Sequence, residues 1–456
     1  MSHNISKVKK VLLILPSYNS VYKGTLFQMG AYPPPLSLAT IAATLVSRGH
    51  DVRIFDLNKH DKTELTGLLK SFSPDYAGIS FSTPLTKEAY IIAAMAKKVK
   101  NNVIIISGGP HSSAMPSDVL KSSEIDVVCI GESDYSVLEV VTKGPNPSIE
   151  GIAYKNESGY PVLQKEKSHW IEDLDNLPFP AWNLFKINEY KTNRFTARTN
   201  PAGFIETSRG CPYGCIYCSK AIFGKNFRAK SVKRVVDEME YMLSCGFREL
   251  LIVDDCFTFH IERAKNICAE ILKRKLKFPW VPINGIRADK VDCELLALMK
   301  KSGCYRVIYG IESGDDAILK LVQKGETLEE IKNAVRMSRE NGLEIVGYFM
   351  LALPGETKET MRKTINFAKE LDLDFAKVSI AIPFPSTPYF EELSKNGKIN
   401  ITEWSNFNMH FPPKKLFEHP NLSWDVIETY YRSFYRGFYL RWGFILKRVI
   451  KNLFKR

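Results

Sequence analysis

Short apolar segments alternate with helix-length amphipathic segments in two long runs of this 456-residue chain. The first run, over residues 8–143, contains five strand-like segments: VLLILP, DVRIFDL, YAGISF, VIIISGG and VVCIGE. Strands separated by helices form parallel sheets with helices on both faces, so this run predicts a doubly wound, Rossmann-like α/β domain. The second run, over residues 203–396, contains six such units and predicts a partial parallel (β/α)6 barrel.

Two less regular regions complete the predicted organisation. Residues 144–202 contain turn signals such as Asn146-Pro147 and the proline-rich stretch LDNLPFPAW, which together predict a hairpin and a linker. Residues 397–456 lie past the barrel pattern and predict a basic, aromatic and helical extension. The chain is longer than the roughly 100–200 residues of one ordinary domain, so this division into several domains is expected.

The apolar and cysteine content constrain the cellular compartment. No apolar run approaches the roughly 18 residues that span a bilayer, and the first apolar stretch is too short for a signal-peptide core. Nine cysteines are an odd number, and most are scattered instead of forming a disulfide framework. We therefore expect a cytoplasmic protein.

Part of the net charge of +13 lies in residues 432–456, which contain eight Lys or Arg and no acidic residue among many aromatic side chains. An aromatic, basic and amphipathic helix can lie in a membrane interface, which would place the protein peripherally at the inner face of the membrane. The alternative is a helix that packs its aromatic face on the mouth of the barrel. Nucleic acid is not an expected partner, because a basic tail without a recognised module is weak evidence for it.

The segment RGCPYGCIYCSK places three thiols, those of Cys211, Cys215 and Cys218, in the spacing Cys-x3-Cys-x2-Cys. Three thiolates at this spacing can hold one [4Fe-4S] cluster and leave one iron without a protein ligand. A structural zinc site is the alternative, but it takes four protein ligands, and the nearest downstream thiol, Cys245, follows a predicted helix and is poorly placed. The spacing therefore favours a cluster with an open iron, which is a reaction site.

These residues resemble the radical S-adenosylmethionine (SAM) superfamily, whose motif has an aromatic residue just before the last cysteine, here Tyr217. The resemblance covers about residues 203–396. It implies that the open iron binds SAM and that the reduced cluster passes one electron to the sulfonium, which yields methionine and a 5′-deoxyadenosyl radical. It also implies a reducing partner such as a flavodoxin or ferredoxin.

Polar residues at the ends of later barrel strands are candidate SAM or substrate contacts, because such positions point into the cavity of a parallel barrel. The candidates are Asp254, Asp255, Arg287, Glu312 and Ser313. Helix capping explains either aspartate equally well.

Two later segments extend the resemblance. Gly355 and Glu356 in LALPGET match a turn that lies near the adenine of SAM in the family, although a helix N-terminus explains them almost as well. The segment PFPSTPYF is similar to the Pro-x-Pro-Gly-Thr-Pro signature of one large subgroup, with Ser386 where glycine is usual. This departure puts the local turn conformation in doubt and leaves the chemistry unaffected.

The first domain resembles the cobalamin-binding class of radical SAM proteins. The segments YPPPLSLATIAATLVSRGHDVRIFD, GISFST, ISGGPHSS and IGESD carry this resemblance in order. The implied cobalamin contacts lie where the strands end: Ser80, Ser82, Thr83, Gly108, Gly109, His111, Gly131 and Glu132. Serines at these positions are also common helix caps.

The Asp-x-His-x-x-Gly element that supplies an axial histidine in some cobalamin proteins is absent, so we expect cobalamin without a histidine ligand. His111 is the one remaining candidate to approach cobalt, and its alternatives are a loop role or contact with the corrin side chains.

The resemblance extends to the C-terminal segment SWDVIETYYRSFYRGFYLRWGFILKRVIKNLFKR, which is similar to the arginine- and aromatic-rich tail of the group that includes the anaerobic magnesium-protoporphyrin ester cyclase and hopanoid-modifying enzymes. It implies an enzyme with a [4Fe-4S] cluster, SAM and cobalamin that methylates an unactivated carbon of a small-molecule or lipid-like substrate. Radical cyclisation or rearrangement without methyl transfer is the second hypothesis, and a zinc-binding interaction protein is the non-enzyme alternative. A methylthiotransferase would carry a second cysteine triplet in the first domain, where this chain has only Cys129.

Overall fold

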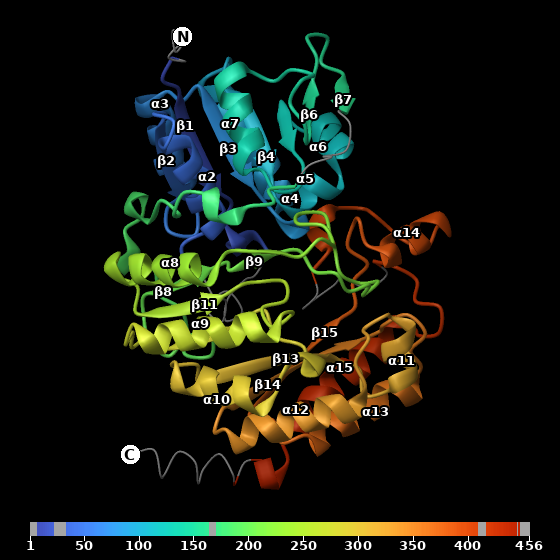
Figure 1. Ribbon diagram of the computed structural model, residues 1–456. Coiled ribbons are helices and arrows are strands. Elements are labelled where there is room, and N and C mark those ends of the chain that lie inside the picture. Colours follow the sequence, from blue (N-terminus) through green and yellow to red (C-terminus); the bar gives the residue numbers. More distant parts are fainter. Residues whose placement is uncertain (1–6, 22–32, 164–169, 409–415, 445, 447–456) are drawn as a thin grey trace. The chain divides into compact units, whose positions relative to one another are not determined.

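The computed structural model describes residues 7–21, 33–163, 170–408, 416–444 and 446 (Figure 1). The chain divides into two compact units. The first unit comprises Met1–Cys211, Ser219–Leu250 and Thr402–Phe407. The second unit comprises Pro212–Cys218, Leu251–Ile401 and Asn408–Arg456. The segment 402–407 therefore belongs to the first unit although it follows the barrel in the sequence.

A seven-stranded sheet forms the centre of the first unit, in the order β2-β1-β3-β4-β5-β6-β7. The first five strands are parallel, and the hairpin of β6 and β7 extends the sheet in antiparallel fashion. A first strand that lies between the second and the third is typical of a doubly wound sheet. The strands are β1 (Lys10–Leu15), β2 (Asp51–Asp56), β3 (Tyr76–Ser80), β4 (Ile104–Gly108), β5 (Val127–Cys129), β6 (Ile152–Lys155) and β7 (Pro161–Leu163).

Helices cover both faces of this sheet (Figure 1). Because side chains alternate along a strand, Leu12 and Ile14 of β1 enter one buried cluster with α3 and α4, whereas Val11 and Leu13 enter a second cluster with α2 and α7. The helices are α2 (Leu36–Val46), α3 (Lys62–Phe72), α4 (Thr86–Val99), α5 (Pro110–Ala114), α6 (Pro116–Ser122) and α7 (Asp134–Lys143).

The barrel strands follow in sequence. A three-stranded sheet has the order β12-β11-β8, a second has the order β13-β14-β15, and β9 pairs with β10. Strands β13, β14 and β15 are parallel. The strands are β8 (Ala202–Ile205), β9 (Ser208–Arg209), β10 (Arg228–Ala229), β11 (Glu249–Ile252), β12 (Trp280–Pro282), β13 (Arg306–Glu312), β14 (Glu344–Leu351) and β15 (Phe375–Ile380).

Helices alternate with these strands, as the sequence periodicity predicts. Thr327 begins α12 with a capping box that also uses Glu330, which fixes this helix start locally. The helices are α8 (Val232–Ser244), α9 (Ile261–Lys273), α10 (Cys293–Lys301), α11 (Asp316–Leu321), α12 (Leu328–Glu340), α13 (Lys358–Glu370), α14 (Pro388–Lys395) and α15 (Trp424–Tyr439). The predicted α/β class, with a doubly wound domain, a six-stranded partial barrel and a helical C-terminal part, is confirmed.

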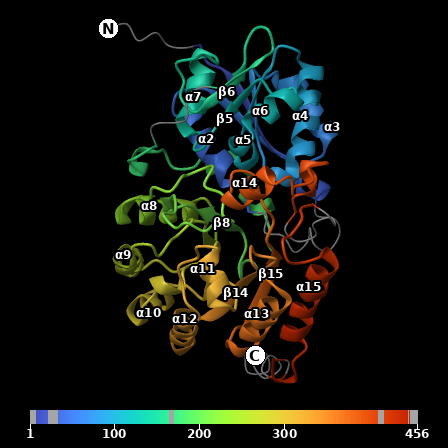
Figure 2. The ribbon, with the colours of Figure 1, turned by 90° about the vertical axis from the view of Figure 1, so that its right-hand side faces the viewer.

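The last helix, α15, packs against β15 and α13 (Figure 2). The hydroxyl of Tyr439 accepts a hydrogen bond from the Ala376 N–H (3.1 Å) and donates one to the Ala376 carbonyl (2.7 Å). Tyr435 bonds to Val378 in the same way, at 3.3 and 3.1 Å. Two phenols thus close the edge strand of the barrel. The helix of residues 424–439 packs on the barrel, as one of the two alternatives predicted, but on β15 and α13 instead of on the barrel mouth.

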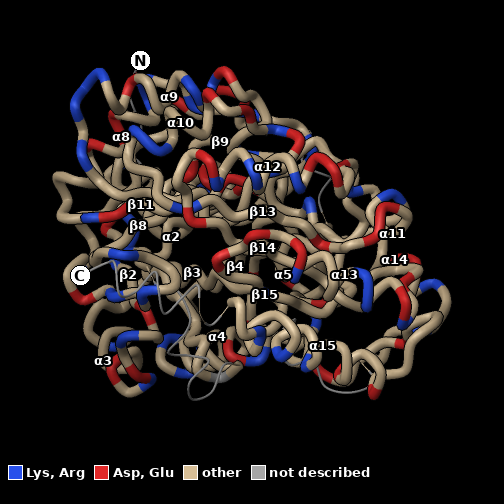
Figure 3. The backbone as a smooth tube through the Cα atoms, turned by 90° about the horizontal axis from the view of Figure 1, so that it is seen from below, with Lys and Arg blue, Asp and Glu red and all other residues tan. Residues whose placement is uncertain are grey.

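The part of the predicted tail at residues 445 and 447–456 lies outside the described residues. None of the helices described here has the length and apolar character needed to span a bilayer. Lys and Arg are interspersed with Asp and Glu along the helices of both units (Figure 3).

Candidate functional site

The three predicted cluster cysteines differ in exposure along their loop. Cys211 is buried, Cys215 is half-buried and Cys218 is exposed. The Cys218 N–H donates to the Cys215 carbonyl at 3.1 Å, so the last two thiols lie on one turn. Among the described residues, no group of three His, Cys, Asp or Glu side chains is arranged to hold a metal ion, so the triplet is defined here by its spacing and thiol chemistry. That donor set fits an iron-sulfur cluster.

The part of the loop after Cys211 is anchored within the second unit. The Ile216 N–H donates to the Val322 carbonyl (3.2 Å), and the Ile216 carbonyl accepts from the Tyr389 N–H (3.1 Å). Ile216 and Tyr217 also pack on a small buried cluster at the strand ends, formed by Ile318, Val322, Leu353 and Ala381. The cysteine loop therefore rests on the α11–α12 connection and on the end of β14.

Glu312 ends β13 beside this loop, with a backbone φ of 64° that non-glycine residues rarely adopt. Its carboxylate is hydrogen-bonded to Tyr217 and lies 3.5 Å from the Lys324 ammonium. Burial raises the pKa of Glu312, with Lys324 opposing this effect and Glu326 reinforcing it. Burial also raises the pKa of Tyr217, together with the charges of Glu312 and of the two nearby thiols. Tyr217, the aromatic residue of the cysteine motif, and Glu312, a predicted SAM contact, thus lie together.

Lys324 was not predicted. Its ammonium is buried 3.1 Å from Glu326 and faces Cys215, whose charge helps to raise the lysine pKa against the effect of burial. The sequence signal for Lys324 is the polar loop VQKGET, which lies between two amphipathic helices.

Arg287 braces this loop instead of facing an open space. It donates to the carbonyls of Lys324 (2.7 Å) and Gly325 (2.8 Å) and to the Asp289 carboxylate (2.7 Å). Its guanidinium lies 3.6 Å from the ring centre of Tyr213, which belongs to the cysteine motif. Arg287 therefore holds the cysteine loop and the α11–α12 connection together.

The remaining barrel candidates differ in their surroundings. Ser313 is fully buried, and its hydroxyl lies 3.3 Å from the Thr364 hydroxyl of α13. Asp254 is buried and Asp255 is exposed after β11. Of these three side chains, Asp255 is the accessible one.

The carboxyl ends of β3 and β4 bring the predicted cobalamin contacts together. Ser80 pairs with Gly108 across the two strands. Gly109 has a φ of 94°, and a Cβ there would lie only 2.7 Å from the Phe81 carbonyl oxygen, so the close approach of β3 and the β4 turn requires glycine. Gly131 follows β5 with a φ of 73° and donates its N–H to the Ser113 hydroxyl (3.0 Å).

His111 is fully buried at this edge. Its Nδ1 lies 3.3 Å from the Thr83 hydroxyl, whereas its Nε2 has no hydrogen-bond partner among the described residues. Burial lowers the pKa of the imidazole to about 4, so the ring is neutral at pH 7. A neutral ring with an unpartnered nitrogen fits a site that receives a polar ligand.

Trp404 covers His111, with 4.9 Å between the ring centres. The indole N–H donates to the Asp118 carboxylate (2.8 Å), and the neighbouring Glu403 pairs with Lys87 at 3.4 Å. The segment 402–407 is therefore a strap on the carboxyl edge of the first sheet. Sequence reasoning missed it because the nearest signal, the lone tryptophan in ITEWSNF, names no partner.

Glu132, predicted as a cobalamin contact, is fully buried and already bonded to two arginines. Arg209 donates to it at 3.1 Å and Arg228 at 2.8 Å. Arg209 also bonds to Asp134 (2.8 Å) and Glu206 (2.7 Å). We call these five residues the arginine clamp. The two arginines were not predicted, although Arg209 stands in the RGC start of the cysteine motif.

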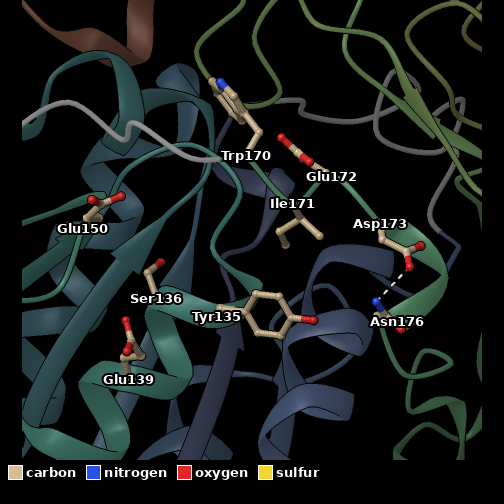
Figure 4. Close-up of a pocket in the computed structure, with 9 residues that line it drawn as sticks. All are labelled: Tyr135, Ser136, Glu139, Glu150, Trp170, Ile171, Glu172, Asp173 and Asn176. Atoms are coloured by element: carbon tan, nitrogen blue, oxygen red, sulfur yellow. Dashed lines mark hydrogen bonds between the residues drawn. The ribbon is translucent and has the colours of Figure 1, made fainter.

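A hollow of about 350 Å³ lies in the first unit beside α7 (Figure 4). Four carboxylates line it: Glu139, Glu150, Glu172 and Asp173, the last of which accepts a bond from Asn176 (2.8 Å). None of the predicted site residues lines this hollow, so it is not the candidate site.

The sequence matches the Radical SAM superfamily over residues 205–368 and the B12 binding domain over residues 22–141. An uncharacterized methyltransferase of Pyrococcus horikoshii is 34% identical, over 98% of this chain and 99% of that protein. The anaerobic magnesium-protoporphyrin IX monomethyl ester cyclase of Rubrivivax gelatinosus is 28% identical, over 95% of this chain and 79% of that protein.

Among solved structures, the fold is similar to that of the radical S-adenosylmethionine methyltransferase TsrM from Kitasatospora setae, which was determined with cobalamin and a [4Fe-4S] cluster bound. The TM-score is 0.70 at 21% identity, over 85% of this chain and 78% of that chain.

Proposed function

Since the chain belongs to the radical SAM family whose members carry a B12-binding domain and include cobalamin-dependent methyltransferases, we propose that it methylates an unactivated carbon of a small-molecule or lipid-like substrate. It is an enzyme whose cofactors are SAM, a [4Fe-4S] cluster and cobalamin. When bound, the reduced cluster supplies an electron that cleaves SAM to a 5′-deoxyadenosyl radical, and the cobalamin carries the methyl group.

Specific residues of this chain have distinct roles in the proposal. Cys211, Cys215 and Cys218 hold the cluster. Tyr217 and Glu312 orient SAM beside it, because a buried carboxylate at a strand end can accept hydrogen bonds from an ammonium or a hydroxyl group. The glycine turns at the ends of β4 and β5, with Ser80, Ser82 and Thr83, receive the cobalamin.

The observation that carries this proposal is the joining of two ligand edges in one chain. The cysteine triplet follows the first barrel strand, and a doubly wound sheet with glycine turns at its carboxyl edge precedes it. We propose the corresponding domain boundaries 8–143, 144–202, 203–396 and 397–456.

Anaerobic purification with cluster reconstitution and added cobalamin tests the proposal. We expect about four irons per chain, bound corrinoid, and release of 5′-deoxyadenosine when dithionite and SAM are added. With SAM labelled by a CD3 group, the enzyme-bound cobalamin should acquire the label without any substrate. Zinc without iron would contradict the cluster assignment, and iron without corrinoid would contradict the methyl-transfer step.

A second candidate function is oxidative cyclisation or rearrangement without methyl transfer. It is favoured by the similarity to the Rubrivivax cyclase over 95% of this chain. Incubation with CD3-labelled SAM and candidate substrates distinguishes the two functions, since a cyclised product carries no deuterium from SAM.

A lipid-like substrate is supported by the end of α15. Trp442 is 80% exposed and Leu440 is 68% exposed, and the basic tail surrounds these apolar side chains in sequence. We propose a cytoplasmic enzyme with a peripheral membrane contact here. In a sedimentation assay, the wild-type protein should pellet with phosphatidylglycerol vesicles, whereas Trp442→Ala should stay in the supernatant. Equal sedimentation of both proteins would remove this support.

A flavodoxin or ferredoxin remains the proposed electron donor.

A further inference from the structure

The arginine clamp links the proposed cobalamin edge to the start of the cysteine loop. Glu132 follows Gly131 in the turn after β5, and Asp134 is the first residue of α7. Arg209 lies on β9, two residues before Cys211. Within the first unit, Arg209 therefore contacts the turn after β5 directly. One contact thus joins the sheet of the B12-binding domain to the start of the cysteine loop.

The clamp is buried and densely bonded. Arg209 uses Nε on Glu206 (2.7 Å), Nη1 on Glu132 (3.1 Å) and Asp134 (2.8 Å), and Nη2 on Asp134 (3.3 Å). The planar fork of the guanidinium directs its N–H groups at three carboxylates in fixed directions, which the single ammonium of a lysine does not. Against the effect of burial, the charges of Asp134 and Glu206 raise the pKa of Arg209.

Arg228 stands directly opposite Arg209 on β10, where two like charges destabilise a strand pair unless they are compensated. The Glu132 carboxylate compensates both, since it accepts from Arg209 and, through both oxygens, from Arg228 (2.8 and 2.9 Å). Glu132 also accepts from the Ile171 N–H at 2.5 Å. The turn after β5 therefore cannot move without breaking bonds to both strands.

The clamp also holds the segment that follows the cysteine loop. Arg228 donates to the Phe223 carbonyl (3.1 Å), and the Cys211 N–H donates to the Gly224 carbonyl (3.4 Å). Gly210, between Arg209 and Cys211, has a φ of 82°, and a Cβ there would collide with the Asn226 carbonyl. Cys211 is thereby fixed from both sides.

We propose that the arginine clamp sets the position of the turn after β5, at the proposed cobalamin edge, relative to Cys211, the first proposed cluster ligand. Arg209 is the main positioning residue of the clamp. This inference rests on the proposed function, in which one substrate carbon must be reached from both cofactors. A misplacement of about 1 Å can lower the rate of such a step by on the order of 100-fold. A clamp that serves only stability would change cofactor content and folding but not the spacing of the cofactors.

Holoenzyme with cob(II)alamin and the reduced cluster, which are both paramagnetic, tests the inference without a substrate. Pulsed electron paramagnetic resonance measures the distance distribution between the two spins in the wild type, in Arg209→Lys and in Asp134→Asn. We expect a shifted or broader distribution in both variants, and a loss of about 100-fold in CD3 transfer from SAM to bound cobalamin in Arg209→Lys. Asp134→Asn removes only one of the charges of the clamp. It therefore provides the test if Arg209→Lys does not fold.

The matched control is Arg306→Lys. Arg306 is a buried arginine that pairs with Glu344 at 3.0 Å at the start of β13, outside the clamp. Its distribution should equal that of the wild type. If the Arg209→Lys and Asp134→Asn holoenzymes give the distance distribution of the wild type, the inference is wrong and the proposed function is unaffected. If the wild-type protein binds no corrinoid, the proposed function itself is refuted.

Discussion

At the scale of single residues, the cysteine triplet makes a direct prediction. Replacing Cys211, Cys215 or Cys218 by Ala removes one of the three proposed cluster ligands, so we expect loss of most of the iron and of SAM cleavage. The control is Cys293→Ala, an exposed thiol on α10 outside the motif. Iron analysis and 5′-deoxyadenosine release check the prediction. A triplet variant with wild-type iron content would contradict it.

Glu356 makes a prediction about pH. It is fully buried before α13, where one carboxylate oxygen accepts from the Leu353 N–H (3.0 Å) and the other has no partner among the described residues. Burial raises its pKa to about 8 from its ordinary value of 4.5. The folded state thus keeps a proton that the unfolded state loses, so the free energy of unfolding falls as the pH rises between these two values.

Glu356→Gln should remove this dependence and be more stable than the wild type at pH 9, by on the order of a few kcal/mol. Urea denaturation at pH 5, 7 and 9 measures the effect. The control is Glu359→Gln, since Glu359 is exposed on the same helix. Parallel pH profiles of the wild type and Glu356→Gln would show that the buried carboxyl group does not hold a proton in the folded state.

Charged residues explain much of what the sequence did not reveal about the site. The cysteine spacing predicts the cluster ligands because that motif is local, and this assignment stays a prediction. Lys324 and Arg209 were missed because charged residues are mostly solvated, and only tertiary contacts bury these two. For the same reason Glu132 was assigned to the ligand, whereas its carboxylate is bonded to two arginines that lie far away in sequence.

At the scale of secondary structure, α15 and β15 form a joint whose strength can be measured. The Tyr435 and Tyr439 hydroxyls each bond both an N–H and a carbonyl of the edge strand. Tyr→Phe at either position leaves these backbone groups without partners, which we expect to lower the free energy of unfolding by about 1–3 kcal/mol. Chemical denaturation of the full chain measures it.

Tyr430→Phe is the matched control, because that hydroxyl only accepts a bond from Arg362 (3.3 Å) at an exposed position of the same helix. Its effect should stay below about 1 kcal/mol. Equal losses in all three variants would mean that the hydrogen bonds to the edge strand stabilise the fold no more than the Tyr430 hydroxyl does.

Local patterns predicted most elements, because the periodicity and caps that form them lie within each segment. The helix of residues 328–340 and the five parallel strands of the first domain are examples. The turn at Ser386 was in doubt, and there the serine adopts a φ of 66°, the left-handed conformation that the usual glycine adopts easily. The strap at Trp404 could not be predicted, since its partner His111 lies in the other half of the sequence.

At the scale of the whole molecule, the two units make a calorimetric prediction. Each unit has its own buried core, so we expect two unfolding transitions. Added hydroxocobalamin should raise the unfolding temperature of the first unit alone, since that unit contains His111 and the glycine turns. At a concentration 100 times its Kd, the free energy of unfolding of this unit should rise by about 2.7 kcal/mol. His111→Ala leaves a gap under Trp404 and should lower that same transition. A shift of both transitions together would contradict the assignment of the ligand to one unit.

The strap has a consequence for biosynthesis. Trp404 leaves the ribosome long after His111, by roughly 15–60 s at ordinary elongation rates. Until then the carboxyl edge of the first sheet lacks the cover that Trp404 provides. The nascent chain therefore offers an open edge to a large cofactor for most of its translation, and the cover closes only after the barrel has been made.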